Sequence, residues 1–594
     1  MTLKNHNLFV VTAFLVFAYF LLLNNFFDWD MFYTFFEVDL RSWIVDKKLP
    51  LWSYQFCGGV TRIGDPQSFG LSPLFLINII FGTIIGSKLQ IFVAAIWGFV
   101  FLRKTLILYL NQFFPSFEHE QEHEHAYTHA HEKIIDLVAL SAIFSNYFLW
   151  HFIFGHITFA LIYYLFAFVY FVIKSFVQAK KISFADYFFA FISLVLVFSA
   201  GFYHSVVFFL LPIGISFALT IVIFVIVRNR GINFFYSIKN IVIVFLLAIL
   251  CCSYKVLAVI NYQSGHPRTI KLDITNQDYT SLFDTLLYHL LPSFDYKLLG
   301  IFKPVSAWGI WELSSFSLNT PVVFFIVTLG LLLFLLKRNR NHQMIPSLTS
   351  NDQTLFLTIL LLSFFVVCTL FSIGNFGTWS PYALINKNIF HNSIRVSSRF
   401  SVGLVYAFTI AGCLLLTLWM KKYKKYKKTE GIIFNILFVL LIVNILFNND
   451  TLKTRYLKWF YNIPSVARYE PMKYLLYPSS LELVPPELST VLTSYMYAFT
   501  LNGKGTIGCI NYLEREHVLD RAIITNRIDN IYTPLIAESA SAECIQKSYF
   551  TQNELFIDKS CSQNICLNLN SIRDQDRKNY SYDKNKKKYC RMQI

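Results

Sequence analysis

Residues 8–27 read LFVVTAFLVFAYFLLLNNFF and contain no charged side chain. A helix needs roughly 20 mostly apolar residues to cross the hydrocarbon core of a bilayer, and this stretch has that length. Its last residues, Asn24-Asn25-Phe26-Phe27, offer no small-residue cleavage site, so we expect an anchor and not a removable signal peptide. The stretch therefore predicts an integral membrane protein.

The composition of the whole chain agrees with this prediction. Of the 594 residues, 55% are hydrophobic and only 14% are charged. A soluble protein of ordinary composition has about 25% charged residues, so a purely soluble enzyme is excluded. The net charge of +16 would suit a nucleic-acid partner. The Lys and Arg residues instead lie largely in short loops between apolar runs, where they set membrane orientation, so we expect no nucleic acid.

Ten more apolar runs follow the first. The eleven predicted spans are 8–27, 88–110, 134–152, 157–174, 184–202, 206–227, 233–253, 320–336, 354–372, 400–419 and 431–448. Residues 71–86 are also apolar but contain Pro73, Gly82 and Gly86, which suit a short helix on the membrane surface. The fold class that we predict is mostly α, integral membrane, with about eleven transmembrane helices.

The positions of Lys and Arg predict which ends face the cytoplasm. If Lys4 is inside, the Lys-rich stretch 421–428 and four earlier basic loops are inside as well, as the positive-inside rule requires. This agreement holds only if 71–86 does not span. The multi-span membrane domain is then 1–448, with its first outer loop at 28–87, and residues 449–594 form an outer C-terminal domain.

The C-terminal domain is polar, with short β-like stretches, and we expect it to be α/β or β-rich. The chain has ten cysteines; those within the predicted spans suit apolar packing. The other six lie outside: Cys57, Cys509, Cys544, Cys561, Cys566 and Cys590. An even set in an oxidising space is compatible with disulfides, and a zinc site is the alternative.

Two carboxylates follow the first span directly, at Asp28 and Asp30. A carboxylate at the membrane surface can act as a general base toward a hydroxyl group or hold a divalent metal such as Mg²⁺ or Mn²⁺. The alternative is that Asp28 only caps the next helix. The metal requirement is unknown from the sequence.

Cationic candidates lie in the other outer turns. They are His156 in Phe154-Gly155-His156-Ile157, His266 and Arg268 in His266-Pro267-Arg268-Thr269, and the pair Arg395 and Arg399. Two arginines four residues apart share one helix face, and guanidinium groups suit phosphate. Anchoring to lipid headgroups is the alternative for the arginines, and an interfacial turn is the alternative for His156.

Several motifs together resemble a family of uncharacterised bacterial multi-pass membrane proteins. They are Asp28-Trp29-Asp30, Leu49-Pro50-Leu51-Trp52, Cys57-Gly58-Gly59, Asp65-Pro66-Gln67-Ser68, Gly155-His156, His266-Pro267-Arg268-Thr269, Gly374-Asn375-Phe376 and Arg395-Val396-Ser397-Ser398-Arg399-Phe400. The resemblance runs from about residue 25 to 415. One departure is Ser397, where the family usually has Pro.

The layout of this family is similar to that of class C glycosyltransferases. The resemblance implies a GT-C-like enzyme in the bacterial inner membrane, with a cytoplasmic N-terminus and a periplasmic or extracellular C-terminus. It would transfer a hexosyl or pentosyl group, with inversion, from a polyprenyl-phosphate sugar to an envelope glycan, lipid or protein. By position, Asp28 or Asp30 would be the base. The substrate-binding residues would be Arg395, Arg399, Arg268, His266, His156, Trp52 and Gln67.

Two other functions remain open at this stage. One is a lipid or glycan transporter or flippase, and the other is a non-catalytic envelope assembly protein. Transporters often have inverted repeats and charges at mid-membrane, and we find no internal repeat in the sequence. The oligomeric state is not predicted.

Overall fold

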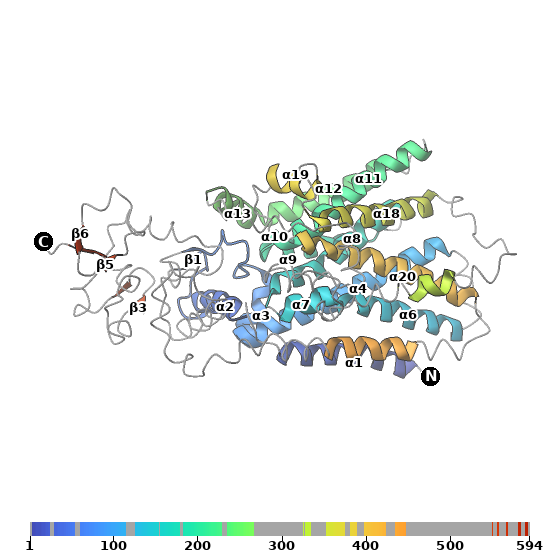
Figure 1. The fold of residues 1–594 in the computed structure, drawn as a ribbon, viewed down its shortest axis with the longest axis horizontal. Helices are drawn as coiled ribbons and strands as arrows, with labels where there is room; N and C mark the ends of the chain where they lie inside the picture. Colours follow the sequence, from blue (N-terminus) through green and yellow to red (C-terminus); the bar gives the residue numbers. More distant parts are fainter. Residues whose placement is uncertain are drawn as a thin grey trace. The chain divides into compact units, whose positions relative to one another are not determined.

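The fold was analysed in a computed structural model of the chain (Figure 1). The described residues are 3–23, 29–53, 60–114, 125–153, 155–178, 182–228, 234–265, 325, 327–333, 352–374, 380–388, 397–422, 434–446 and five short strands between 549 and 591. Asp28, His266, Arg268 and Arg395 lie outside these residues, as do Cys57 and the Gly374-Asn375-Phe376 motif beyond Gly374.

The chain divides into two compact units. The first unit consists of residues 1–24, 88–257 and 269–451, and the second of residues 25–87, 258–268 and 452–594. The first unit is therefore built from most of the predicted spans. The second contains the predicted first outer loop and the C-terminal region.

The first unit is helical throughout its described residues. Its elements are α1 (Leu3–Leu23), most of α4 (Thr83–Phe113), α6 (His125–Ile143), α7 (Asn146–Ile153), η2 (Ile157–Ala160), α8 (Leu161–Val177), α9 (Phe184–Ser199), α10 (Tyr203–Ser205), η4 (Val206–Leu210), α11 (Leu211–Arg228), α12 (Phe234–Cys251), α18 (Asp352–Ile373), α19 (Pro381–Asn388), η6 (Ser397–Ser401) and α20 (Val402–Lys422).

Helix packing in this unit relies on apolar and aromatic side chains. Helix α8 packs on α9, α11 packs on α18, and α18 packs on α20 (Figure 1). The ring of Phe9 contacts those of Phe434 and Phe438, so the first helix lies beside the helix 434–446. Side-chain polar groups are satisfied between helices as well, as where Trp97 Nε1 donates to Ser193 Oγ at 3.1 Å. Such pairing is expected because an unsatisfied polar group in an apolar interior is costly.

Within the described residues, six helices are long and apolar enough to cross a membrane. They are Thr83–Phe113, Glu132–Ile153, Ile157–Val177, Tyr203–Val227, Asp352–Ile373 and Arg399–Met420. Each of them coincides with one of the eleven predicted spans. The structure therefore supports a multi-pass membrane protein, and the number eleven stays a prediction.

The predicted spans outside this set differ in length or shape. Leu8–Leu23, Phe184–Ser199 and Phe434–Leu446 are apolar but shorter than the six. Helix α12 continues after a bend of 73° into α13 (Ser253–Gly265). The first residues of the outer loop predicted at 254–319 are thus helical, and the outer position of this loop stays a prediction.

The second unit begins with α2 (Trp29–Ile44). It is followed by a two-stranded hairpin of β1 (Trp52–Ser53) and β2 (Val60–Thr61). Next come the 3₁₀ turn η1 (Pro73–Phe75) and the six-residue helix α3 (Leu76–Phe81). Helix α3 ends at Gly82, whose positive φ of 75° starts the turn into α4. Helix α3 is too short to cross a bilayer.

The described part of the C-terminal region consists of short antiparallel strands. Strand β3 (Tyr549–Phe550) pairs with β4 (Leu555–Phe556). A second sheet has the order β5 (Cys566–Leu567), β7 (Lys588–Arg591) and β6 (Tyr580–Asp583). The α/β or β-rich character of residues 449–594, and their forming a separate domain, stay predictions.

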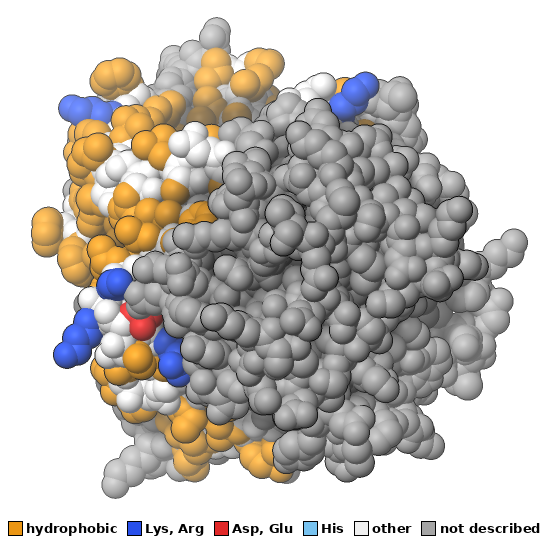
Figure 2. All heavy atoms as spheres, turned by 90° about the vertical axis from the view of Figure 1, so that its left-hand side faces the viewer, with side chains coloured by type: hydrophobic (Ala, Val, Ile, Leu, Met, Phe, Trp, Pro, Cys, Tyr) orange, Lys and Arg blue, Asp and Glu red, His pale blue; other side chains and the backbone are white. Residues whose placement is uncertain are grey.

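Large hydrophobic side chains are exposed along several helices of the first unit. Ile226 on α11, Phe235 on α12 and Leu362 on α18 are examples. Figure 2 shows hydrophobic side chains gathered over the described surface, with few Lys, Arg, Asp or Glu side chains among them. Exposed apolar surface of this extent is typical of a lipid-facing protein.

Candidate functional site

The acidic residues proposed as base or metal ligands are only partly described. Asp28 lies outside the described residues, and Asp30 is in the first turn of α2, where its backbone alone is described. Helix α2 begins at Trp29, the residue after Asp28. Both the catalytic role and the capping role of Asp28 therefore stay predictions.

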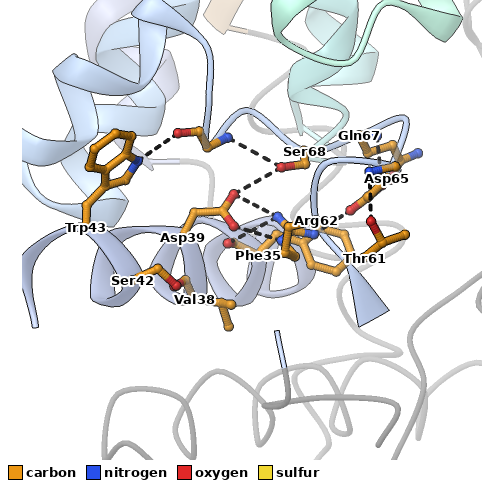
Figure 3. A network of polar contacts seen from close by, with 12 residues as sticks. Phe35, Val38, Asp39, Ser42, Trp43, Thr61, Arg62, Asp65, Gln67 and Ser68 are labelled. Atoms are coloured by element: carbon orange, nitrogen blue, oxygen red, sulfur yellow. Dashed lines mark hydrogen bonds and ion pairs between the residues drawn. The ribbon is translucent and has the colours of Figure 1, made fainter. Parts of the chain in front are cut away.

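A buried ionic network ties α2 to the turn after β2 (Figure 3). The guanidinium of Arg62 donates from Nε and Nη2 to the two carboxylate oxygens of Asp39, at 2.8 Å each. It also donates to a carboxylate oxygen of Asp65 and to the carbonyl oxygen of Phe35. Ser68 Oγ donates to Asp39 at 3.2 Å.

This network holds the 60–70 segment against α2 and is closed to ligands from solvent. The side chains of Arg62 and Asp39 are both 0% exposed, so Arg62 cannot meet a ligand from solvent. A buried guanidinium needs paired carboxylates because an uncompensated buried charge is very costly. The network therefore fixes the 60–70 segment on α2. The sequence analysis missed Asp39 and Arg62, and the motif Asp65-Pro66-Gln67-Ser68 was the only signal near them.

Two proposed substrate-binding residues lie in this same second unit. Trp52 is in strand β1 and is 37% exposed. Gln67 is half-buried, and its backbone N–H donates to Asp65 Oδ1 at 2.8 Å. Its Oε1 atom has no hydrogen-bond partner among the described residues. Both belong to the second unit, whereas His156 and Arg399 belong to the first, and a site shared by these residues stays a prediction.

The first unit contains a group of four cationic or titratable side chains around one phenylalanine. We call His151, His156, His204 and Arg399, which surround Phe159, the histidine–arginine cluster. They come from α7, from the turn before η2, from α10 and from η6, and Phe159 itself lies in η2. Four separate helical segments thus converge on this cluster.

The ring of Phe159 is the shared contact of the cluster. The imidazole of His151 stacks on it with ring centroids 3.7 Å apart and planes 7° from parallel. The imidazoles of His156 and His204 lie at centroid distances of 5.8 and 5.3 Å from it. The guanidinium carbon of Arg399 lies 5.5 Å from its centroid, within cation–π range.

The histidines also make direct polar contacts. The Nδ1 atoms of His151 and His156 are 2.9 Å apart. The Nδ1 atom of His204 lies 3.3 Å from Thr158 Oγ1. His151 also lies within electrostatic range of His156, Arg399 and His204.

Local backbone geometry explains how the short turn delivers His156. Gly155 has a positive φ of 80°, which a side chain would strain, and the backbone N–H of His156 donates to the carbonyl of His151 at 2.8 Å. The turn therefore places two histidines five residues apart side by side. His156 thus lies in a tight turn that joins it to the cluster, and the position of this turn at the membrane interface stays a prediction.

Two further features position His204 and Arg399. The π-helical turn η4 begins two residues after His204 and includes Phe208, whose ring centroid lies 5.7 Å from the Arg399 guanidinium carbon. Single π turns are frequent at functional sites because they re-aim neighbouring side chains. The hydroxyl of Tyr147 donates to the carbonyl oxygen of Arg399 at 2.8 Å and so fixes η6 against α7.

The cluster is buried at one end and accessible at the other. His151 is 2% exposed, whereas His156, His204 and Arg399 are half-buried. The Nε2 atom of His151 is buried and has no hydrogen-bond partner among the described residues. Imidazole and guanidinium N–H groups are donors, and a ligand with several acceptor oxygens and negative charge matches them.

The described residues contain no group of three or more His, Cys, Asp or Glu side chains with the geometry to hold a metal ion. The three histidines of the cluster do not form such a group. A Mg²⁺ or Mn²⁺ site at Asp28 and Asp30 stays a prediction, because the described side chains do not include them.

Tertiary structure thus brings together two predicted residues and adds two that the sequence analysis missed. His156 and Arg399 share Phe159 although they are far apart in the sequence. His151 lies inside the predicted span 134–152, and His204 lies in the short break Tyr203-His204-Ser205 between two predicted spans. A histidine within or directly beside an apolar run was the signal that could have found both. Comparison of the chain with protein-family models, with curated proteins and with solved structures finds no match.

Proposed function

We propose that the chain is a membrane glycosyltransferase that uses a polyprenyl-phosphate sugar and binds the donor phosphate at the histidine–arginine cluster. The observation that carries the proposal is the convergence of Arg399 and three histidines on Phe159 within a unit of apolar helices. Ionisable residues in membrane helices are costly to bury, so such a group indicates function by default.

The depth of the cluster supports a lipid-linked phosphate. Arg399 is the first residue of the candidate span Arg399–Met420, and His156 directly precedes Ile157–Val177. His151 is two residues before the end of Glu132–Ile153, and His204 is the second residue of Tyr203–Val227. All four side chains therefore lie at the ends of candidate spans. Lipid phosphates lie at this level of a bilayer, just outside the hydrocarbon core.

In the proposed reaction, the cationic residues of the cluster and the acidic residues Asp28 and Asp30 have different roles. The bond between the sugar C1 and the donor phosphate oxygen breaks, and the electron pair stays on the phosphate. Arg399 and the histidines stabilise the resulting charge by hydrogen bonds. Asp28 or Asp30 accepts the proton of the acceptor hydroxyl, whose oxygen bonds to C1 from the opposite face, with inversion. The resemblance to the GT-C-like family supports this assignment.

The test is release of polyprenyl phosphate by the full chain in lipid nanodiscs. Polyprenyl-phosphate hexose and pentose are offered as donors together with envelope extract as the source of acceptor. We expect Asp28→Asn or Asp30→Asn to abolish release while the donor still binds, and Asp46→Asn to be without effect. If the wild-type chain releases polyprenyl phosphate from neither donor, the proposal is contradicted.

A second function is favoured by one observation. Helices α12 and α13 form a pair bent by 73°, and broken helices are common at transporter binding sites. A transporter or flippase would move a polyprenyl-phosphate lipid between leaflets without cleaving it. A scrambling assay with the same donor in proteoliposomes separates the two: movement of intact donor without release supports the transporter.

A further inference from the structure

Lys104 on α4 is an exposed lysine whose amine lies among aromatic rings. Its Nζ atom is 4.8 Å from the ring centroid of Phe101, 5.9 Å from that of Tyr170 and 5.7 Å from that of Phe189. These rings belong to α4, α8 and α9, and we call them and Lys104 the lysine–aromatic site. Aromatic faces attract an ammonium without accepting strong hydrogen bonds from it, so its N–H donors remain available to an oxygen acceptor.

The charge of Lys104 is not neutralised by a carboxylate among the described residues. The two neighbouring cations each have one, because Arg103 Nε lies 2.6 Å from Asp136 and Lys174 Nζ lies 2.8 Å from Asp186. No ion pair or hydrogen bond joins Lys104 to any residue that the structure describes. Charged side chains within membrane helices usually pair with an opposite charge, so the site matches an anionic ligand.

Lys104 ends a stripe of exposed apolar side chains along α4. Val93, Ile96 and Val100 are 36%, 39% and 39% exposed. The spacing of three and four residues places them on the same helix face as Lys104. On the neighbouring helix α9, Phe188 is exposed as well. Exposed apolar surface on a membrane helix faces acyl chains, so Lys104 faces lipid and not the interior of the helix bundle.

The lysine–aromatic site lies far from the histidine–arginine cluster along the helices. Ile157, which directly follows His156, is the first residue of the candidate span Ile157–Val177. Tyr170 is 13 residues after it (170 − 157 = 13), and Lys174 is 17 residues after it (174 − 157 = 17). At 1.5 Å per residue these separations are roughly 20 and 26 Å, against a hydrocarbon core about 30 Å thick. A lysine side chain can extend from this depth to the headgroups, so the amine reaches the phosphates of the opposite leaflet.

We propose that the lysine–aromatic site binds the phosphate of an anionic phospholipid, such as phosphatidylglycerol, whose acyl chains lie along the apolar stripe of α4. The Nζ atom of Lys104 donates to the phosphate oxygens, and the three rings hold the amine in position. A zwitterionic lipid fits less well, because its own ammonium neutralises the phosphate and repels Lys104. In the predicted orientation this is the cytoplasmic leaflet, where anionic lipids attract basic side chains. The site is independent of the proposed transferase activity.

The test is native mass spectrometry of the full chain in detergent micelles. The chain is titrated with phosphatidylglycerol, with phosphatidylethanolamine of the same acyl chains, or with inorganic phosphate. Successive lipid adducts differ in mass, so the first lipid bound gives its own dissociation constant. We expect the wild type to bind phosphatidylglycerol more tightly than phosphatidylethanolamine, and Lys104→Gln to weaken the binding of phosphatidylglycerol about 5-fold.

Three further variants separate the site from a general effect of charge. Lys239→Gln is the matched control, because Lys239 is an exposed lysine in the second turn of α12 that contacts no aromatic ring among the described residues. It should bind phosphatidylglycerol as the wild type does. Lys104→Arg keeps a cation beside the rings and should also bind normally. Phe189→Leu leaves the charge unchanged but removes one ring, so we expect weaker binding.

The outcomes decide both the site and its occupant. Equal affinities of Lys104→Gln and Lys239→Gln for phosphatidylglycerol would overturn the proposal, and so would equal affinities of the wild type for the two lipids. If inorganic phosphate displaces the lipid at equal concentration, the site takes free phosphate and the lipid assignment fails. Loss of binding in Lys104→Gln at an unchanged melting temperature, with normal binding in Lys104→Arg, supports the proposal.

Discussion

The imidazole of His151 lies flat on the ring of Phe159, with centroids 3.7 Å apart and an angle of 7° between the planes. Arg399 lies over the same ring, with its guanidinium carbon 5.5 Å from the centroid. One apolar side chain therefore sets the positions of both the buried histidine and the arginine. The consequences of this arrangement, and of three others in the molecule, can be measured.

Phe159→Leu should weaken phosphate binding more than it weakens the fold. Leucine keeps an apolar side chain at this buried position but removes the flat ring that His151 and Arg399 contact. Stacking and cation–π contacts contribute roughly 0.5–2 kcal/mol, so we expect the affinity for farnesyl phosphate to fall about 3- to 30-fold. Phe364→Leu is the matched control, because Phe364 is also buried and its ring contacts are with Phe217 and Tyr406. Equal losses of affinity in the two variants would contradict the role of Phe159.

Arg399→Lys should not preserve binding, although it preserves the charge. A guanidinium can lie on Phe159 and Phe208 and still offer two parallel donors to a phosphate, which an ammonium group cannot do. A charge-assisted hydrogen bond contributes about 1.5–3 kcal/mol, so we expect roughly 10- to 100-fold weaker binding of farnesyl phosphate. Arg103→Lys on α4 is the control, because Arg103 pairs with Asp136. Wild-type affinity in Arg399→Lys would mean that charge alone is sufficient.

Asp39→Ala should destabilise the first outer segment. The substitution removes both oxygens that accept from Arg62 at 2.8 Å and so takes one carboxylate partner from a fully buried guanidinium. Breaking a buried pair costs about 3–5 kcal/mol, and Asp39→Asn, which keeps the shape, should cost less. Thermal unfolding of the purified chain and limited proteolysis measure the effect. Asp46→Ala is the control, and the same sensitivity to protease in both variants would argue against the network.

Gly403→Ala should destabilise the packing of α18 against α20. A methyl group added at Gly403 would overlap the Sγ atom of Cys368, which is itself buried. Overpacking costs typically about 1–3 kcal/mol, so we expect a lower melting temperature. The double variant Gly403→Ala with Cys368→Ala should recover part of the loss, because the sulfur is gone. Gly214→Ala has nothing within 4 Å of the added methyl group and should be neutral or slightly stabilising. A double variant as unstable as the single one would contradict this explanation.

Cys566 and Cys590 should form a disulfide. They are direct cross-strand partners of β5 and β7. The Cα atoms of such partners are roughly 4.5–5.5 Å apart, and disulfides join Cα atoms about 4.4–6.8 Å apart. Mass spectrometry of the unreduced chain from native membranes should find the two cysteines in one cross-linked peptide. Alkylation of both thiols before reduction would contradict the pairing and would also argue against an oxidising location of the C-terminal region.

The sequence was sufficient for the class of fold because the bilayer imposes a local rule. Spans such as 157–174 and 354–372 were predicted within a few residues, since a helix must bury its backbone polar groups and present about 20 apolar side chains. The rule does not predict where a helix bends, or which helices are shorter than a full membrane span. Hydropathy falls from α12 to α13 and so marks the end of the apolar run, but it does not show that the chain stays helical beyond this point, at an angle of 73°.

Some residues of the candidate site could be found from the sequence, and others could not. From the sequence, Arg399 and His156 stood out as polar residues at the ends of apolar runs, and the motifs marked the region around Asp65. Only the three-dimensional packing shows that Arg399 and His156 meet at Phe159, where His151 and His204 join them. The same holds for the pairing of Asp39 with Arg62. Hydropathy and residue spacing are signals that extend over only a few helical turns. The contacts of Phe159 join segments as much as 240 residues apart along the chain (399 − 159 = 240), and only the packing of α7, α10 and η6 around η2 brings them together.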